Sequence, residues 1–203
     1  MYARHLFLCL LCLIGHTGYT QPYNPAANPG AVVTAGNARF TILTERLIRL
    51  EYSPDSMFNN NATITFVNRN MPVPWFEQKT ENGRLIIKTA SLQLSYVLNS
   101  GMFSAGNLRI EYTGPDRSFT WHPGQRNKYN LKGTTRTLDG TSGKYSFQTM
   151  KKINTGDGIL SRDGWALVDD SKKPTFDKSE WPWVQNNAAA GNTDWYFFGY
   201  GNN

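Results

Sequence analysis

The sequence predicts an all-β protein, an antiparallel β-sandwich, and three observations support this fold class. Apolar residues alternate with polar ones in several short segments, as half-buried strands require. The dipeptide Asn82-Gly83, a strong type I′ hairpin signal, separates two such segments. No segment has the i, i+3, i+4, i+7 apolar spacing of an amphipathic helix. The content of 13% aromatic and only 18% charged residues agrees with this fold class.

The alternating segments follow one another at intervals of about 10–15 residues, which is typical of a sandwich. Each segment places its apolar residues on one face. The expected strands are 39–42, 48–52, 63–66, 76–81, 84–89, 92–96 and 108–112.

The second half of the chain is predicted to be less regular. Residues 121–145 are polar, basic and rich in glycine, as a long functional loop would be. Residues 158–170 are expected to form two short strands around a turn at Asp163-Gly164. Residues 171–193 are expected to be a second polar loop, and residues 194–200 an aromatic strand.

The first 20 residues are predicted to be a secretory signal. Arg4 and His5 form a basic start, and Leu6–Ile14 is a run of nine apolar residues. A membrane-spanning helix needs about 20, so the alternative of a membrane anchor is less favoured. We expect cleavage after Gly18-Tyr19-Thr20, a secreted or periplasmic product and no membrane association of the mature protein.

The remaining chain is expected to consist of an extended leader, residues 21–34, and one β-sandwich domain, residues 35–203. Cys9 and Cys12 lie in the signal, so the mature chain has no disulfide and no thiol nucleophile. His122 is its only histidine, which excludes a histidine-rich zinc site within the chain. We therefore expect no cofactor and no metal. Basic residues are scattered apart from two lysine pairs, and no nucleic-acid contact is expected.

Three motifs occur in a fixed order in the second half: NLKGTTRTLD at 130–139, GILSRDGWALVDDS at 158–171 and DWYFFGYG at 194–201. This combination resembles the N-terminal domain of glycoside hydrolase family 31, the α-glucosidase and α-xylosidase family. The resemblance covers about residues 35–203, and the middle motif is the most specific. It implies a β-sandwich of the galactose-mutarotase-like kind, which agrees with the fold class that the alternation predicts.

The resemblance also implies a function. In the family a (β/α)₈ barrel of roughly 250 residues follows this domain and supplies an aspartate nucleophile and an aspartate acid/base. The chain contains no counterpart of those catalytic motifs, so we expect a non-catalytic domain of a secreted retaining α-glucosidase-type enzyme, with the barrel absent. The implied partners are that barrel and an α-linked glucoside or related oligosaccharide.

Arg136 and Asp139 are the candidate substrate-binding residues. In the family a loop of this domain reaches over the barrel mouth and helps to form the leaving-group side of the pocket. Charged side chains suit that place because they hydrogen-bond sugar hydroxyls directionally. The alternative is an ion pair or a turn that holds the loop.

Other polar and aromatic residues have more ordinary interpretations. The adjacent Asp169 and Asp170 are not expected to be a catalytic pair, because neighbouring side chains on a strand point to opposite faces. Four tryptophans offer flat apolar surfaces on which sugar rings could stack. Core or interdomain packing is favoured for Trp165 and Trp195, whereas both interpretations remain open for Trp181 and Trp183.

Two other classes of function remain: a free-standing carbohydrate-binding sandwich and a purely structural extracellular sandwich. The chain stops two residues after the motif that contains the aromatic strand 194–200. We expect one side of that strand to pack against the barrel, which favours the enzyme domain over the free-standing module.

Overall fold

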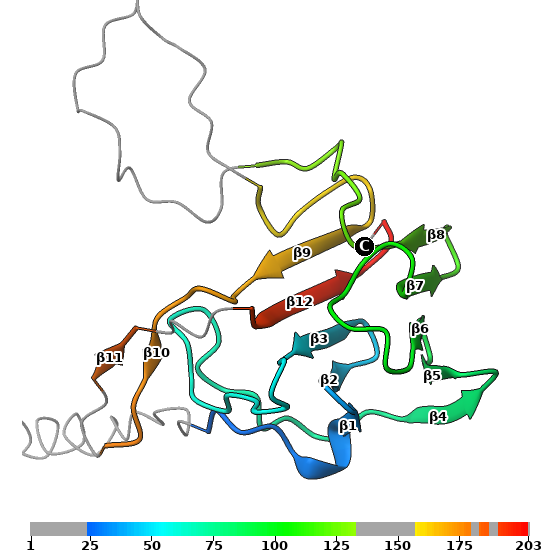
Figure 1. The fold of residues 1–203 in the computed structure, drawn as a ribbon. Coiled ribbons are helices and arrows are strands. Elements are labelled where there is room, and N and C mark those ends of the chain that lie inside the picture. Colours follow the sequence, from blue (N-terminus) through cyan, green and yellow to red (C-terminus); the bar gives the residue numbers. More distant parts are fainter. Residues whose placement is uncertain (1–23, 133–156, 180–182, 187–190, 203) are drawn as a thin grey trace, which may run out of the picture.

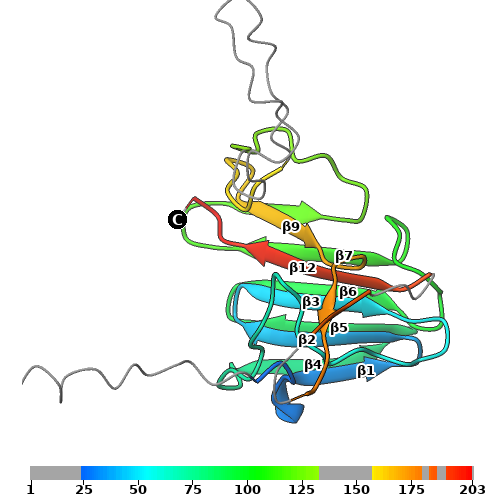
Figure 2. The same ribbon diagram turned by 90° about the vertical axis from the view of Figure 1, so that its left-hand side faces the viewer.

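The computed structural model describes residues 24–132, 157–179, 183–186 and 191–202. Two five-stranded sheets lie face to face (Figures 1 and 2), in the orders β1-β2-β3-β12-β9 and β4-β5-β6-β7-β8. All the strand pairs within both sheets are antiparallel. The all-β sandwich predicted from the sequence is therefore confirmed. No helix in these ranges is long and apolar enough to cross a membrane.

The first sheet combines strands from both ends of the chain. Its members are β1 (Val32–Ala35), β2 (Ala38–Thr44), β3 (Leu47–Tyr52), β9 (Trp165–Asp169) and β12 (Thr193–Gly199). The C-terminal strand β12 lies between β3 and β9. Part of the expected leader belongs to the fold, because a short 3-10 helix, η1 (Pro29–Ala31), leads directly into β1.

The second sheet is a meander of neighbouring strands: β4 (Phe76–Glu81), β5 (Arg84–Thr89), β6 (Leu92–Val97), β7 (Leu108–Thr113) and β8 (Ser118–Trp121). The hairpin between β4 and β5 forms where it was predicted. Asn82 and Gly83 have φ of 50° and 72°, as a type I′ turn requires.

The core lies between the two sheets. Aromatic rings gather there around Phe103, whose ring centroid is 5.8 Å from that of Phe40 and 5.6 Å from that of Tyr96. Such offset and edge contacts add to the free energy gained by burying the rings. The second sheet turns its other face to solvent, whereas the central residues of β2 and β3 in the first sheet are buried on both faces.

The outer face of the first sheet is covered by the segment between β3 and β4, residues 53–75. The prediction of a strand at 63–66 is wrong. Thr63 makes only an isolated bridge with Thr175, and Ile64 points outward. Thr175 belongs to a small hairpin, β10 (Thr175–Phe176) paired with β11 (Val184–Gln185), inside the expected polar loop 171–193.

Candidate functional site

The described parts of the three sequence motifs meet at the start of β9, next to the end of β12. Asn130, from the first motif, forms a bridge with Ser161 of the second. The Asn130 side chain also accepts a hydrogen bond from the Gly158 amide at 2.8 Å and donates one to the Gly158 carbonyl at 2.9 Å. Figure 1 shows these two stretches side by side, in green and yellow. The amide of Asn130 thus joins segments 28 residues apart.

The second and third motifs are joined at the turn Asp163-Gly164. The Gly164 carbonyl accepts hydrogen bonds from the amides of Tyr200 and Gly201, at 2.9 and 3.0 Å. Gly164 has φ of +81°, and a Cβ there would lie 2.8 Å from the Gly201 carbonyl oxygen. The predicted turn is confirmed, and glycine is required there on both counts. Its first arm, residues 158–162, bonds to 129–131 instead of forming a strand with β9.

A hollow of about 310 Å³ opens beside this motif junction. Trp165 and Leu167 of β9 form its apolar wall, and the remaining lining is polar: Gln125, Arg126, Asn127, Asn130, Lys132 and Asp157. Asn127 is held in place because it accepts from the Ser161 hydroxyl and donates to the Trp165 carbonyl. The polar part of the hollow thus combines amides, one of them fixed, with charged groups.

The motif junction also exposes apolar side chains. Tyr129, Leu131, Ile159 and Leu160 are between 46% and 64% exposed, and they come from two stretches that hydrogen-bond to each other. Exposed large apolar side chains that gather in one region are typical of a surface that contacts another protein surface. We call these four residues the apolar ribbon.

Arg136 and Asp139, the predicted substrate-binding residues, lie in 133–156, outside the described residues. The two residues that border this segment, Lys132 and Asp157, form an ion pair. The segment therefore leaves and re-enters the fold at one place, at the rim of the hollow.

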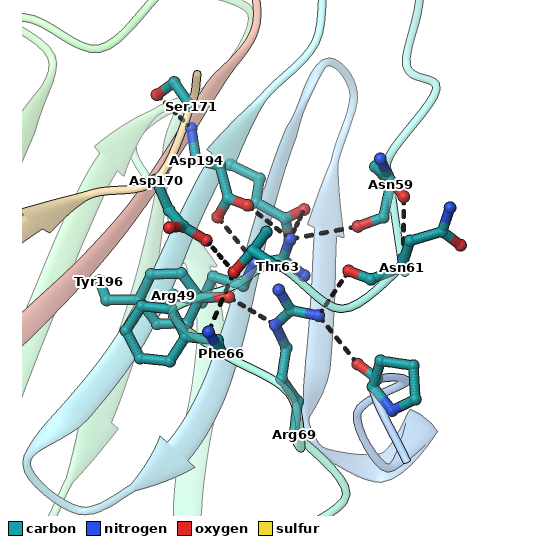
Figure 3. Close-up of polar contacts among 12 residues, drawn as sticks. Arg49, Asn59, Asn61, Thr63, Phe66, Arg69, Asp170, Ser171, Asp194 and Tyr196 are labelled. Atoms are coloured by element: carbon teal, nitrogen blue, oxygen red, sulfur yellow. Dashed lines mark hydrogen bonds and ion pairs between the residues drawn. The ribbon is translucent and has the colours of Figure 1, made fainter. Parts of the chain in front are cut away.

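A second polar cluster is buried under segment 53–75, on the outer face of the first sheet (Figure 3). Arg49 of β3 donates from Nε and Nη2 to the Asp194 carboxylate at 2.8 and 2.7 Å, and from Nη2 to the Asn59 carbonyl at 3.1 Å. Burial alone would lower the pKa of Arg49, but the charges of Glu51 and Asp194 outweigh it and raise that pKa. Arg49 therefore keeps its positive charge although it is buried.

Arg69 anchors the covering segment to the same sheet. Its Nε donates to the Tyr196 hydroxyl at 2.5 Å, and its Nη1 donates to the carbonyls of Pro25 and Asn61. The ring of Phe66 stacks on that of Tyr196 with centroids 3.5 Å apart. Burial raises the pKa of Tyr196. Tyr196 is thus covered within this chain, so the expectation that one side of the aromatic strand packs against a barrel is wrong for this ring.

The adjacent carboxylates behave as the strand geometry predicts. Asp169 is exposed and accepts from the Ser171 amide and hydroxyl. Asp170 is fully buried and accepts from the Thr63 hydroxyl at 2.6 Å. Burial raises the pKa of Asp170.

The space beside Asp194 in the second cluster is too small for a sugar. The hollow beside Asp194 has a volume of about 30 Å³, which is enough for about one water molecule. Among the described residues, no group of three or more His, Cys, Asp or Glu side chains is placed to hold a metal ion. The second cluster therefore has a structural role: it holds segment 53–75 on strands β3 and β12.

Two of the four tryptophans, Trp165 and Trp195, were expected to pack in the core or against another domain. Trp165 is buried in the core, and Trp195 is half-buried and packs against it. Trp183 is 67% exposed, which excludes core packing for this side chain, and Trp181 lies outside the described residues.

Sequence reasoning missed Asn127, Asn130 and Arg69. For the two asparagines, the only signal in the sequence was a polar residue type, within the expected loop for Asn127 and at the start of the first motif for Asn130.

No family model matches the chain, and no curated protein is similar to it in sequence. Among solved structures, it is similar to a GH31 dextranase of Flavobacterium johnsoniae, FjDex31A, complexed with glucose, with 14% identity and a TM-score of 0.44. A mutant of that dextranase complexed with isomaltotriose gives 14% identity and a TM-score of 0.42. Both matches cover 90% of this chain and 27% of the other, so the chain spans about a quarter of their length.

Proposed function

We propose that this chain is the N-terminal, non-catalytic β-sandwich domain of an exported, retaining α-glucosidase-type glycoside hydrolase of family 31. One observation carries the proposal. The described parts of the three motifs that resemble the family are far apart in sequence, yet they meet at one junction. The first two motifs line a hollow there, at the base of segment 133–156, and the third is bonded to the second at Gly164. A structural sandwich would not need its most distinctive residues at one place.

The domain has two roles in this proposal. The apolar ribbon packs against a catalytic (β/α)₈ barrel, because burying its four large side chains there removes them from water. Segment 133–156, which starts beside the ribbon, carries Arg136 and Asp139 to the sugar pocket of that barrel. The substrate is an α-linked glucoside or related oligosaccharide, and residues 1–20 are the export signal.

A second candidate function, a free-standing carbohydrate-binding sandwich, is favoured by one observation. Trp183 presents an exposed indole directly before β11, and its backbone amide donates to the Asp177 carboxylate at 3.0 Å. Binding of isomaltotriose or another α-glucan to residues 21–203 alone, lost in Trp183→Ala, would support this candidate over the enzyme domain.

Residues 21–203 should not hydrolyse p-nitrophenyl α-glucoside. Retaining hydrolysis needs two carboxyls about 5–5.5 Å apart around a sugar. The hollow beside Asp194 has no room for a sugar, and Asp170 is fully buried. A longer protein that includes the barrel should be active in the same assay. Turnover by residues 21–203 that is lost on replacing one of their carboxylates would contradict the proposal.

In the barrel-containing enzyme, Asp139→Ala should lower kcat/KM by about 10-fold or more. The variant would lose a hydrogen bond between the Asp139 carboxylate and the sugar, and one hydrogen bond to a charged group contributes ~1.5–3 kcal/mol. The melting temperature should stay within error of the parent. Glu77→Ala, an exposed carboxylate on β4, is the matched control and should leave both quantities unchanged. A lower melting temperature with normal kinetics would show instead that Asp139 only holds its loop.

A further inference from the structure

Another hollow lies on the outer face of the first sheet, over β1, β2 and β3, at the opposite edge of that sheet from β9. Its volume is about 320 Å³, at the lower end of the range for small-molecule sites, ≈300–1,000 Å³. Two arginines line it together with small or neutral residues: Ala27, Pro29, Val32, Arg39, Thr41, Arg49 and Asn60. No acidic side chain is part of this lining.

The two guanidinium groups are fixed from behind. Arg39 donates from Nε and Nη2 to both carboxylate oxygens of Glu51, each at 2.7 Å. Arg49 is held in the same fork-to-fork manner by Asp194. Arg39 and Arg49 are only 9% and 3% exposed. Because their positions are set by these pairs, a ligand would not have to order them.

Each guanidinium has one nitrogen, Nη1, to which the described part of the chain supplies no hydrogen-bond acceptor. No hydrogen bond within the described residues reaches Nη1 of Arg39 or of Arg49. Neither nitrogen is among the fully enclosed polar atoms that lack a partner, so both retain access to open space. Guanidinium nitrogens only donate hydrogen bonds. The hollow therefore presents charged donors and calls for a ligand rich in acceptors.

We propose that this hollow binds a small oxyanion, a carboxylate or phosphate group on a molecule up to the size of an acidic monosaccharide. Arginine is well matched to such groups, because its planar donors fit two oxygens and its charge is permanent. Thr41 and Asn60 add neutral polar groups at the wall and the rim. The site does not depend on the proposed glycosidase function, since it involves neither the motif junction nor a barrel.

The test is calorimetric titration of the signal-free chain, residues 21–203, with inorganic phosphate, glucuronate and glucose at constant ionic strength. Phosphate, glucuronate or both should bind at one site, and neutral glucose should not. Binding of phosphate alone would identify a phosphate or phosphoester ligand, and binding of glucuronate alone a carboxylate. The absence of binding by both anions would overturn the proposal.

A charge variant at the rim locates the binding. Asn60→Asp keeps the side-chain size and adds a negative charge at the hollow without touching either ion pair. It should weaken anion binding about five-fold, the effect of roughly 1 kcal/mol between close charges in water. Asn186→Asp makes the same change at an exposed position outside the hollow and should have little effect. Equal weakening by both variants would place the anion elsewhere and overturn the assignment.

Discussion

Replacing Arg49 by methionine should lower the free energy of unfolding by about 3–5 kcal/mol, the usual cost of removing one partner from a buried ion pair. Arg49 is 3% exposed and binds both carboxylate oxygens of Asp194, with Glu51 3.1 Å from its Nη2. Methionine fills similar space but leaves the Asp194 carboxylate under segment 53–75 without its cation. It also removes the hydrogen bond to the Asn59 carbonyl, one anchor of that segment.

Urea denaturation of the parent and the variant measures this loss, and Arg109→Met is the matched control. Arg109 pairs with Glu111 at 3.0 Å, but on the solvent-facing side of the second sheet, where both side chains are largely exposed. That pair should contribute less than about 1 kcal/mol. Similar losses in the two variants would show that the buried pair has no special role in stability.

Two features of the sequence were sufficient to predict the sandwich. Alternation placed Leu50 on the inner face and Arg49 on the outer face of β3, as the structure has them. Turn chemistry fixed the β4–β5 hairpin, because Asn82 and Gly83 tolerate positive φ. Both signals are local, so a single chain contains all the information that they need.

What covers a sheet face is not a local property. Arg39, Arg49 and Glu51 alternate with apolar residues as solvent-facing side chains do, yet segment 53–75 buries all three. The contacts that hold this segment span long stretches of chain, such as Arg69 to Tyr196. For the same reason alternation at 63–66 predicted a strand, whereas Thr63 is held by the Asp170 carboxylate and forms only one bridge.

The candidate site was predictable in part. The motifs indicated which stretches of the chain form the candidate site, and Asn130, Ser161 and Gly164 belong to these motifs. These residues come together because β9 pairs with β12. The two strands are about 30 residues apart in the sequence, and the alternation of apolar and polar residues does not show which distant strands pair. The roles of Arg136 and Asp139 stay predictions.

Gly164→Ala should be the most damaging single change at the motif junction, with a loss of about 3 kcal/mol in the free energy of unfolding. The left-handed backbone, φ of +81°, costs an L-residue roughly 1–2 kcal/mol. In addition, the new methyl group would lie 2.8 Å from the Gly201 carbonyl oxygen. Main chain has to move to relieve that contact, and overpacking of this kind costs about 1–3 kcal/mol more.

Gly124→Ala separates the two contributions. Gly124 also has φ of +81°, but nothing lies within 4 Å of a Cβ built there. This variant should lose only the backbone part, so the difference between the two unfolding free energies measures the contact between the second and third motifs. Equal losses would mean that the turn and the Gly201 backbone adjust freely. In the barrel-containing enzyme, Gly164→Ala should also lower kcat/KM while Gly124→Ala does not, because the displaced turn carries Ser161 and, through it, Asn130 and the entry to segment 133–156.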